Sequence, residues 1–400
     1  MASLPERLAL VHEWFTPRST GGSELVVRQM DRLAAERGAQ VQLFALVDGD
    51  SSRAGSWLEG RSIHTSFIQR LPWGVSHVQQ YLPLLPLAIE QLDLADYPLV
   101  LSSNHLVAKG VLTSPEQLHL SYVHTPVRYA WDQMHAYLSR SSLARSPLGP
   151  LLRWQLHQLR LWDQLSSARV DQLVANSRFT AQRIRRCWRR SSVVIHPPVA
   201  VDRFRCSQDR SDVYVSLCRL VPYKRVDLVV EAFNRTGLPL VVIGDGPERA
   251  RLEAMARPNV RFLGRCGSQE SAEWLERCRA YVYAGLEDFG IAPVEAMAAG
   301  APVIAYGAGG LLDSVRCLQA DQSLPTGLLF PRQSAASLVE ALEYFEAGQL
   351  WRRLSAEALR QWAEGFGPEQ FRLKLAALLE RRWELHRRRL DAGRRPVPLA

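Results

Sequence analysis

The feature that most constrains the fold of this chain is a regular alternation of short apolar runs with amphipathic helical patterns. The runs in the first half are RLALV (7–11), VQLFALV (41–47), YPLVLSS (97–103), LHLSYV (118–123) and QLVANS (172–177). Uninterrupted apolar strands are typical of parallel sheets that helices cover on both faces. The first half is therefore predicted to be an α/β domain with a parallel sheet.

The alternation is interrupted once and then starts again. The segment HPPVAVDRFRCSQDRSD (196–212) is rich in proline and charge and has no apolar period, which is typical of a linker. The later runs are VYVSL (213–217), LVVIG (240–244), VRFLG (260–264), AYVYA (280–284), PVIAY (302–306) and GLLF (327–330). We therefore predict two Rossmann-like α/β/α domains, residues 1–197 and 205–370, followed by a C-terminal helix and basic tail over residues 371–400.

The charge balance of the 400-residue chain favours anionic partners. It has 49 Lys and Arg against 40 Asp and Glu, a net charge of +9. The six cysteines contain no CxxC pair, which argues against a structural zinc site or a disulfide framework and favours reduced thiols in a cytoplasmic protein. No apolar stretch approaches the ~20 residues of a membrane span, and no nucleic-acid-binding motif accompanies the positive charge.

Two carboxylates flank a turn in LEDFGIAPVEAMAAGAPVIA (286–305). Glu287 follows an apolar run, Pro293 suits the first turn of a helix, and we expect Glu295 in that same turn. The amides at this helix start would bind an anion, and the carboxylates could accept hydrogen bonds from hydroxyl groups of a sugar or ribose. Two solvated acids near a helix N-terminus fit the same pattern, and the spacing alone does not decide between them.

Two cations follow another apolar run, in SLCRLVPYKRVDLVV (216–230). Arg219 and Lys224 lie in the predicted loop between a strand and a helix. Two cations at the C-terminal end of a parallel strand fit a diphosphate, although this pair taken alone favours two solvated basic side chains.

Two weaker signals lie in the first half of the chain. Gly21 and Gly22 precede a helical pattern and would let the backbone approach an anionic ligand, although neither GxGxxG nor a P-loop is present there. His124 ends the apolar run of SYVHTPVRYAWDQ (121–133), where it would point towards a ligand at the sheet edge. A histidine whose hydrogen bonds are satisfied within the fold is the alternative.

A basic region rich in tryptophan lies between residues 149 and 190. GPLLRWQLHQLRLWDQL (149–165) and RFTAQRIRRCWRR (178–190) combine arginines with Trp154, Trp162 and Trp188. Basic residues beside aromatic side chains suit an anionic membrane surface. The alternative is a helix that packs on its own domain and has a solvated basic face.

Several motifs together resemble those of family 4 of the retaining glycosyltransferases. They are EDFGIAPVEAMAAGAPVIA with its two spaced acids, RLVPYKRVD, VIGDGPE, TGLLF (326–330) and the early glycine turn. YVHTPVRYAWD resembles a subgroup that includes mannosyltransferases of bacterial surface-polysaccharide assembly. The resemblance implies the GT-B fold, in which an N-terminal acceptor-binding domain and a C-terminal nucleotide-sugar-binding domain face a cleft.

The resemblance also implies a role for each candidate residue. Arg219 and Lys224 would bind the donor diphosphate, Glu295 would hold the ribose, and Glu287 would hold the transferred sugar. The other implied contacts are Phe289, Gly290 and Ile291 with phosphate or sugar, Gly21 and Gly22 with the diphosphate, and His124 with the sugar near the reacting carbon. Many relatives have Glu where Asp313 stands, so we assign that position no role.

The implied reaction is transfer of a hexose, with mannose from GDP-mannose favoured, from a nucleotide-sugar to a lipid-linked or polysaccharide acceptor. The leaving phosphate itself would take the acceptor's proton, so no protein nucleophile, metal or cofactor is expected. The expected location is the cytoplasm, with peripheral association at the inner face of the cell membrane. The alternatives are another GT-B activity, such as a nucleotide-sugar epimerase or a phosphorylase, and a non-catalytic nucleotide-sugar-binding membrane scaffold.

Overall fold

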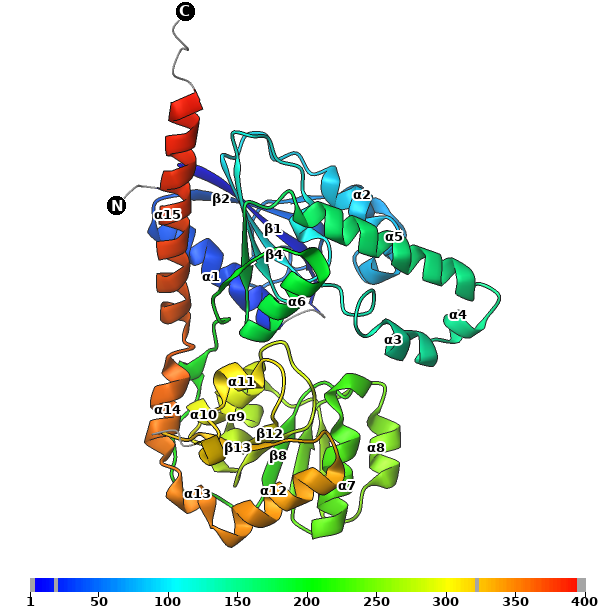
Figure 1. Ribbon diagram of the computed structural model, residues 1–400, viewed down its shortest axis with the longest axis vertical. Helices are drawn as coiled ribbons and strands as arrows, with labels where there is room; N and C mark the ends of the chain where they lie inside the picture. The colour runs from blue at the N-terminus through cyan, green and yellow to red at the C-terminus, as the bar shows by residue number, and fades with distance from the viewer. Residues whose placement is uncertain (1–3, 18–20, 321–323, 394–400) are drawn as a thin grey trace, which may run out of the picture. The chain divides into compact units, whose positions relative to one another are not determined.

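A computed structural model describes residues 4–17, 21–320 and 324–393 (Figure 1). The chain forms two compact units. Unit 1 contains residues 1–196 together with 371–400, and unit 2 contains residues 197–370. Each unit is built around its own parallel sheet, as the alternation of apolar runs and helical patterns predicts.

Unit 1 has a parallel sheet of seven strands in the order β3-β2-β1-β4-β5-β6-β7. The strands are β1 (Arg7–Phe15), β2 (Gln40–Asp48), β3 (Ile63–Thr65), β4 (Leu99–Asn104), β5 (Leu118–Val123), β6 (Gln172–Ala175) and β7 (Val193–Val194). The helices are α1 (Gly22–Glu36), α2 (Leu85–Glu90), α3 (Met134–Arg140), α4 (Ser142–Arg145), α5 (Gly149–Ser167) and α6 (Arg178–Trp188). Apart from Arg7, strands β1, β4 and β5 are buried on both faces, as is typical of a parallel sheet that helices cover on both sides, and their polar side chains are buried as well.

The strand order of unit 1 reverses between β1 and β4, which pair in parallel with His12 beside Ser103. Ligands of open α/β sheets bind at the carboxyl ends of the strands where the order reverses. The first place to look for a ligand site in unit 1 is therefore the end of β1 and the turn after β4.

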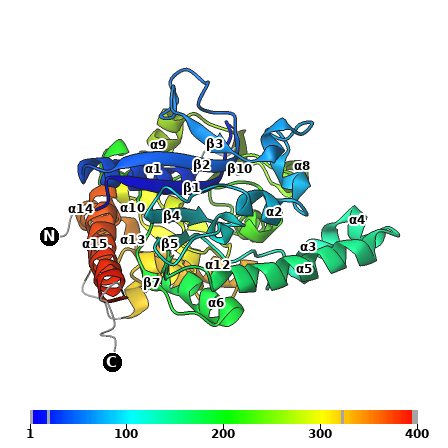
Figure 2. The ribbon, with the colours of Figure 1, turned by 90° about the horizontal axis from the view of Figure 1, so that it is seen from above.

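A long helix at the C-terminus, α15 (Pro368–Gly393), belongs to unit 1 from Phe371 onward. It lies beside α1 in Figures 1 and 2. The Phe371 ring meets the Tyr122 ring edge-on at a centroid distance of 5.6 Å, and Arg37 donates to Glu380 at 2.9 Å. The last helix of the chain therefore completes the hydrophobic core of the first unit.

Unit 2 has a parallel sheet of six strands in the order β10-β9-β8-β11-β12-β13. The strands are β8 (Tyr214–Leu217), β9 (Leu240–Ile243), β10 (Val260–Gly264), β11 (Tyr281–Tyr283), β12 (Val303–Tyr306) and β13 (Gly327–Phe330). The helices are α7 (Val226–Thr236), α8 (Arg249–Met255), α9 (Ser268–Arg277), α10 (Ile291–Ala298), α11 (Leu311–Ser314), α12 (Ala335–Ala347), α13 (Leu350–Arg353) and α14 (Ala356–Glu364). Here the strand order reverses between β8 and β11, so a ligand site is expected where these two strands end.

Candidate functional site

Glycines bring the loops at the carboxyl ends of the unit 2 strands into backbone contact. Gly244 follows β9 with φ 140°, and a Cβ atom there would lie 1.9 Å from the carbonyl oxygen of Cys218, directly after β8. A Cβ atom on Gly310, after β12, would lie 2.1 Å from the carbonyl oxygen of Asp288, after β11. A Cβ atom on Gly285, after β11, would lie 2.9 Å from Cα of Lys224, after β8, so the four loops form one surface at the point where the strand order reverses.

Lys224 and Glu287 meet at the centre of this surface. Lys224 ends the short 3₁₀ helix η5 (Pro222–Lys224) after β8, and its Nζ atom donates to Oε1 of Glu287. The Tyr283 hydroxyl donates to the same oxygen at 2.6 Å. The Lys224 and Glu287 side chains are 16% and 14% exposed. Burial opposes the Lys224 charge, but the Glu287 carboxylate outweighs it and raises the pKa of the ammonium group.

Arg219 is the second cation of this loop, and it is exposed. Within the part of the chain that the structure describes, its guanidinium makes neither a hydrogen bond nor an ion pair. An unpaired guanidinium beside the end of β8 can bind an anion without first losing a protein partner. The two cations therefore differ: Lys224 is neutralised by a carboxylate, and Arg219 is not.

Glu295 is a partly buried acid that contacts Arg203. The expectation that it occupies the first turn of its helix is wrong, because α10 begins at Ile291 and Glu295 lies in the second turn. Its side chain is 15% exposed, and Nη2 of Arg203 lies 3.4 Å from Oε1. Burial raises the pKa of the Glu295 carboxyl, and Arg203 only partly offsets this. Neither predicted acid is a simple solvated side chain.

The turn between the two acids offers its backbone to a ligand. The Phe289 side chain is buried against the Phe366 ring at a centroid distance of 5.5 Å, so it belongs to the core. Gly290 has φ 91°, a value that side chains disfavour, and it caps the N-terminus of α10 at Ile291. The amides of this segment are therefore the groups that can meet an anion.

The other predicted residues lie in unit 1. Gly21 caps α1, which begins at Gly22, and as a glycine it has no side chain of its own to bond the amides of this helix start. His124 directly follows β5, and its Nε2 atom lies 2.9 Å from Oγ of Ser103. Burial, together with the neighbouring His105 and His12, lowers the pKa of His124 to about 3. The structure thus places the sequence-predicted residues at the strand ends of two separate sheets.

The sequence analysis missed a fully buried acid in unit 1, Glu13 of β1. Its Oε1 atom accepts hydrogen bonds from four successive backbone amides, those of residues 105–108, at 2.7–3.1 Å. Burial opposes its charge, but His105, His12 and these amides outweigh burial and hold the pKa of Glu13 below its usual range. The sequence does contain an indication of this site, because the polar pair His12-Glu13 interrupts the apolar strand sequence RLALVHEWF.

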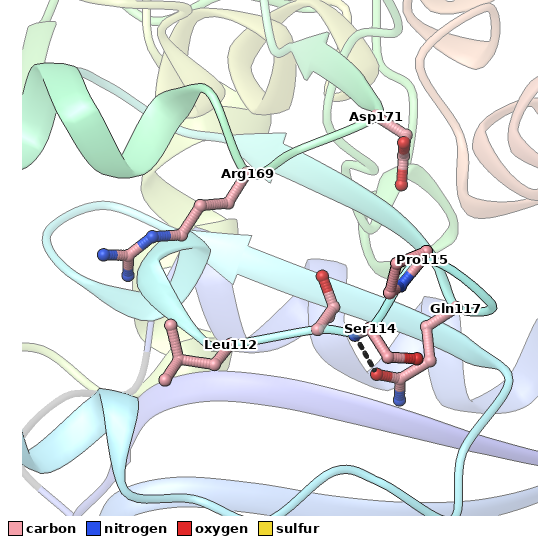
Figure 3. A pocket seen from close by; sticks show the side chains of 7 residues that line it. Leu112, Ser114, Pro115, Gln117, Arg169 and Asp171 are labelled. Carbon is pink, nitrogen blue, oxygen red and sulfur yellow. Dashed lines mark hydrogen bonds between the residues drawn. The ribbon is translucent and has the colours of Figure 1, made fainter.

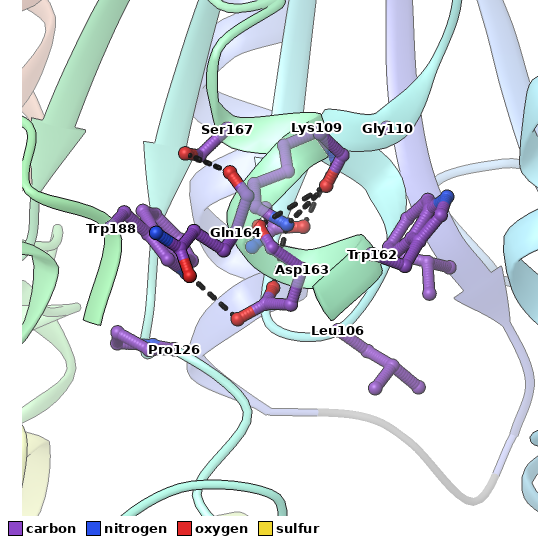
Figure 4. Close-up of polar contacts among 12 residues, drawn as sticks. Leu106, Lys109, Gly110, Pro126, Trp162, Asp163, Gln164, Ser167 and Trp188 are labelled. Atoms are coloured by element: carbon purple, nitrogen blue, oxygen red, sulfur yellow. Dashed lines mark hydrogen bonds and ion pairs between the residues drawn. The ribbon is translucent and has the colours of Figure 1, made fainter. Parts of the chain in front are cut away.

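A second missed feature is a buried ion pair that anchors the same turn. Nζ of Lys109 donates to Oδ1 of Asp163 at 2.6 Å, and both side chains are fully buried. The indole N–H groups of Trp131 and Trp188 donate to the other oxygen, each at 2.7 Å. Figure 4 shows Lys109 and Asp163 between Trp162 and Trp188. This network ties the turn after β4 to α5 and α6.

This network corrects the interpretation of the basic region. Trp188 is buried and Trp162 is partly buried, so neither is an interfacial aromatic. Arg183 is also buried, and it donates to Asp132 at 2.6 Å. Trp154, in contrast, is 57% exposed. Any surface role of this region therefore depends on α5 and on the exposed arginines of α6.

A cavity of about 380 Å³ lies away from these residues, next to the N-terminal ends of β5 and β6 (Figure 3). It is lined by residues between Leu112 and Gln117 together with Arg169 and Asp171. Asp171 accepts from the His119 amide at 2.8 Å, and Arg169 pairs with Glu90 at 2.5 Å. These contacts join secondary structure elements, and none of the predicted site residues lines the cavity.

Two further findings concern the described residues alone. No group of three or more His, Cys, Asp or Glu side chains among them is arranged to hold a metal ion. None of their helices is long and apolar enough to cross a membrane.

Both units match glycosyltransferase sequences. The profile described as "Glycosyltransferase Family 4" matches residues 20–203, and "Glycosyl transferases group 1" matches residues 203–364. A GDP-mannose-dependent alpha-mannosyltransferase of Mycobacterium tuberculosis is 28% identical over 335 residues, which cover 80% of this chain and 84% of that relative.

Solved glycosyltransferase structures share the fold. Sucrose-phosphate synthase from Thermosynechococcus elongatus has a TM-score of 0.69 and 20% sequence identity, covering 97% of this chain and 100% of that chain. Anabaena HepE in complex with UDP-glucose has a TM-score of 0.65 and 16% identity, covering 93% and 99%. The two Rossmann-like domains are therefore those of the GT-B fold.

Proposed function

Because this chain belongs to the family 4 glycosyltransferases of the GT-B fold, we propose that it transfers a hexose from a nucleotide-sugar to a lipid-linked or polysaccharide acceptor with retention of configuration. The observation that carries the proposal is the set of cations and carboxylates at the strand-order reversal of unit 2. Arg219 and Lys224 follow β8, and Glu287 follows β11. This position is where open α/β sheets bind nucleotides.

The two cations fit the diphosphate of such a donor. Arg219 is exposed and unpaired within the described chain, so it can meet the diphosphate directly. Lys224 contacts Glu287, and a phosphate oxygen can replace or share that contact. Negative charge grows on the departing phosphate in the transition state, and fixed cations lower the barrier at that stage. In this proposal the two cations supply the charge compensation, and no metal or cofactor is required.

The two carboxylates fit hydroxyl groups of the donor. Glu295 is partly buried on α10, and burial raises the pKa of its carboxyl group. A hydroxyl group of a ligand is therefore a suitable hydrogen-bond partner for this carboxyl. Glu287 has one oxygen bonded to Lys224 and Tyr283, which leaves its second oxygen to accept from a sugar hydroxyl. In this proposal Glu295 holds the ribose and Glu287 holds the transferred sugar.

Mannose from GDP-mannose is the donor that we propose. The support is the similarity to the M. tuberculosis mannosyltransferase, which extends over most of both chains. The YVHTPVRYAWD segment, with its resemblance to polysaccharide mannosyltransferases, supports the same choice. UDP-glucose, which Anabaena HepE binds, is the donor to compare with it.

We also propose that α5 rests on an anionic membrane, at the inner face of the cell membrane. Its outer side has a stripe of exposed apolar residues: Leu151 (53%), Trp154 (57%), Leu161 (44%) and Leu165 (70%). The helix extends beyond the sheet in Figures 1 and 2. The basic region, residues 149–190, contains nine arginines and two aspartates, a net charge of +7 that complements anionic headgroups. This surface would bring unit 1 to a lipid-linked acceptor.

A thermal-shift screen with GDP-, UDP- and ADP-sugars, followed by product analysis, tests the proposal. A donor that binds only the folded protein raises its melting temperature by mass action. GDP-mannose should give the largest shift, and transfer should follow when acceptor is added. Epimerised nucleotide-sugar as the product would instead favour the epimerase, and binding without any turnover would favour the scaffold.

A further inference from the structure

Glu13 is a buried charge for which the proposed donor chemistry has no use. It is fully buried in β1, and its Oε1 atom binds the four amides of residues 105–108. The turn at residues 105–108 does not need a carboxylate to bind its amides, since backbone carbonyl groups or an uncharged side chain can accept amide hydrogen bonds. A buried carboxylate costs several kcal/mol of desolvation, roughly, unless its partners compensate. The four amides bind only Oε1, so the role of the second oxygen, Oε2, remains to be explained.

That second oxygen faces the imidazole of His105. Nδ1 of His105 is buried and lies 3.2 Å from Oε2 of Glu13. Within the described chain neither atom has a hydrogen-bond partner of good geometry, so this short contact is the one that is open to both. A carboxylate can only accept, so the contact favours the tautomer with a proton on Nδ1. The ring is 28% exposed, and Nε2 has no hydrogen-bond partner within the described chain. The geometry leaves the Nε2 lone pair free to meet a ligand.

The position of this pair repeats that of the donor site. In unit 2, Lys224 and Glu287 come from the loops after β8 and β11, between which the strand order reverses. In unit 1 the order reverses between β1 and β4; Glu13 lies near the end of β1, and His105 is the first residue after β4. Both pairs therefore occupy the point at which sheets of this type bind ligands.

The turn that carries His105 is fixed at both ends. Glu13 holds its amides, the Asn104 side chain accepts from the Lys109 amide at 3.0 Å, and the Lys109 ammonium is held by Asp163 (Figure 4). The Trp14 ring meets the imidazole edge-on at a centroid distance of 4.9 Å. A side chain fixed this closely yet partly exposed is suited to binding a ligand in one orientation.

We propose that His105 binds a hydroxyl group of the sugar acceptor through Nε2, and that Glu13 is the positioning residue that sets its ring orientation and tautomer. The proposal rests on the proposed glycosyl transfer and adds the residue that selects and orients the acceptor. His124 stands nearby, with its ring centroid 6.4 Å from that of His105, and its Nε2 is already bonded to Ser103. The acceptor contact is therefore assigned to His105.

The test uses the full chain with GDP-mannose as donor and octyl α-D-mannopyranoside as the acceptor probe. His105→Phe keeps the ring and its packing but removes both nitrogens. It should raise KM for the probe roughly tenfold, the worth of one lost hydrogen bond, and leave the affinity for GDP unchanged in calorimetry. His64→Phe, at an exposed position of β3, is the matched control and should change neither quantity.

Glu13→Gln tests the positioning role, because its carbonyl oxygen can still accept the four amides while its NH₂ group faces His105. The His105 tautomer should switch from Nδ1–H to Nε2–H in ¹⁵N–¹H correlation spectra of histidine-labelled protein, a change that a purely structural role would not produce. In the wild type with GDP bound, octyl mannoside should shift the His105 ring signal and leave the His64 signal in place.

Two outcomes overturn the proposal: an unmoved His105 signal at saturating octyl mannoside, or unchanged acceptor kinetics in His105→Phe. Failure of the proposed function gives a different result, since wild-type protein would then bind no GDP and release none from GDP-mannose. The tautomer spectra report on the Glu13–His105 pair in either case.

Discussion

The contact between Lys224 and Glu287 predicts that removing the acid strengthens nucleotide binding. Without ligand, the Glu287 carboxylate neutralises the ammonium that is proposed to meet the diphosphate. Glu287→Gln removes the negative charge but keeps the size of the side chain and an oxygen that can accept from Tyr283. The variant should therefore bind the bare nucleoside diphosphate more tightly, while Lys224→Met should bind it more weakly.

The magnitude follows from Coulomb's law. A carboxylate and a phosphate that share one ammonium are about 6 Å apart, and at an effective dielectric constant of roughly 20–40 one such repulsion is worth about 1.4–2.8 kcal/mol. Glu287→Gln should thus tighten GDP binding roughly 10- to 100-fold. Turnover should fall on the order of 10²-fold, because the proposed contact of this carboxylate with the transferred sugar would strengthen in the transition state.

Titration calorimetry with GDP, beside initial rates with GDP-mannose, measures both effects. Glu231→Gln on α7 is the matched control, since this acid is exposed and pairs with Arg235 one turn away. In the Lys224→Met background, Glu287→Gln should tighten GDP binding by less than it does in the wild type. The two substitutions act on one contact, so their effects on the binding free energy are coupled. If Glu287→Gln weakens GDP binding as much as Lys224→Met does, the carboxylate contributes to nucleotide binding, and it does not compete with the diphosphate for the Lys224 ammonium.

Three further predictions concern other parts of the molecule. Arg219→Ala should lower kcat/KM for the donor on the order of 10²–10³-fold by removing one fixed charge at the leaving group, and an unchanged value in steady-state assays would remove Arg219 from the site. Trp154→Ser/Leu165→Ser should reduce co-sedimentation with anionic vesicles at low salt; if wild type binds neutral and anionic vesicles equally, the charge argument fails. Burial lowers the pKa of His119 to about 3 in the folded protein, below its ordinary value of about 6.5 in the unfolded chain. As the pH drops below about 6.5, the unfolded chain binds a proton that the folded protein does not, so the free energy of unfolding falls. His119→Gln should therefore lose about 2 kcal/mol less than wild type between pH 7 and pH 5 in urea unfolding, and an equal loss would mean that this imidazole does not stay neutral when folded.

Most of the fold could be predicted because its signal is local. The apolar runs at 118–123, 240–244 and 327–330 became β5, β9 and β13 with bounds that differ by one residue or none. Strands β3 and β7 were missed because three residues and two residues are too short to show a period. The sequence pattern also identified the last helix, but it could not tell which core that helix joins.

The packing of α15 on unit 1 is a long-range contact that periodicity does not encode. Phe371, Leu375, Leu379 and Trp383 recur at helical spacing, which predicts an amphipathic helix and no particular partner. The same limit explains the missed Glu13, whose four amide partners lie more than 90 residues away in the sequence.

The candidate site in unit 2 was predicted residue by residue, but its internal contacts were not. The strand-end positions of Lys224 and Glu287 follow from the alternation of strands and helices, since both lie in the loop between an apolar run and the next helical pattern. Their contact with each other depends on β8 and β11 being neighbours, although about 60 residues separate them in the sequence, and the strand order decides that.

We propose that this chain transfers mannose from GDP-mannose with retention and without a metal. The most direct test follows GDP-mannose, octyl mannoside and the enzyme in excess chelator by NMR spectroscopy, and assigns the anomeric configuration of the new linkage from its one-bond C1–H1 coupling. Our account predicts GDP release that is matched by an α-mannosyl product. A β-linked product, or turnover that stops with chelator and returns only with a divalent metal, would contradict it.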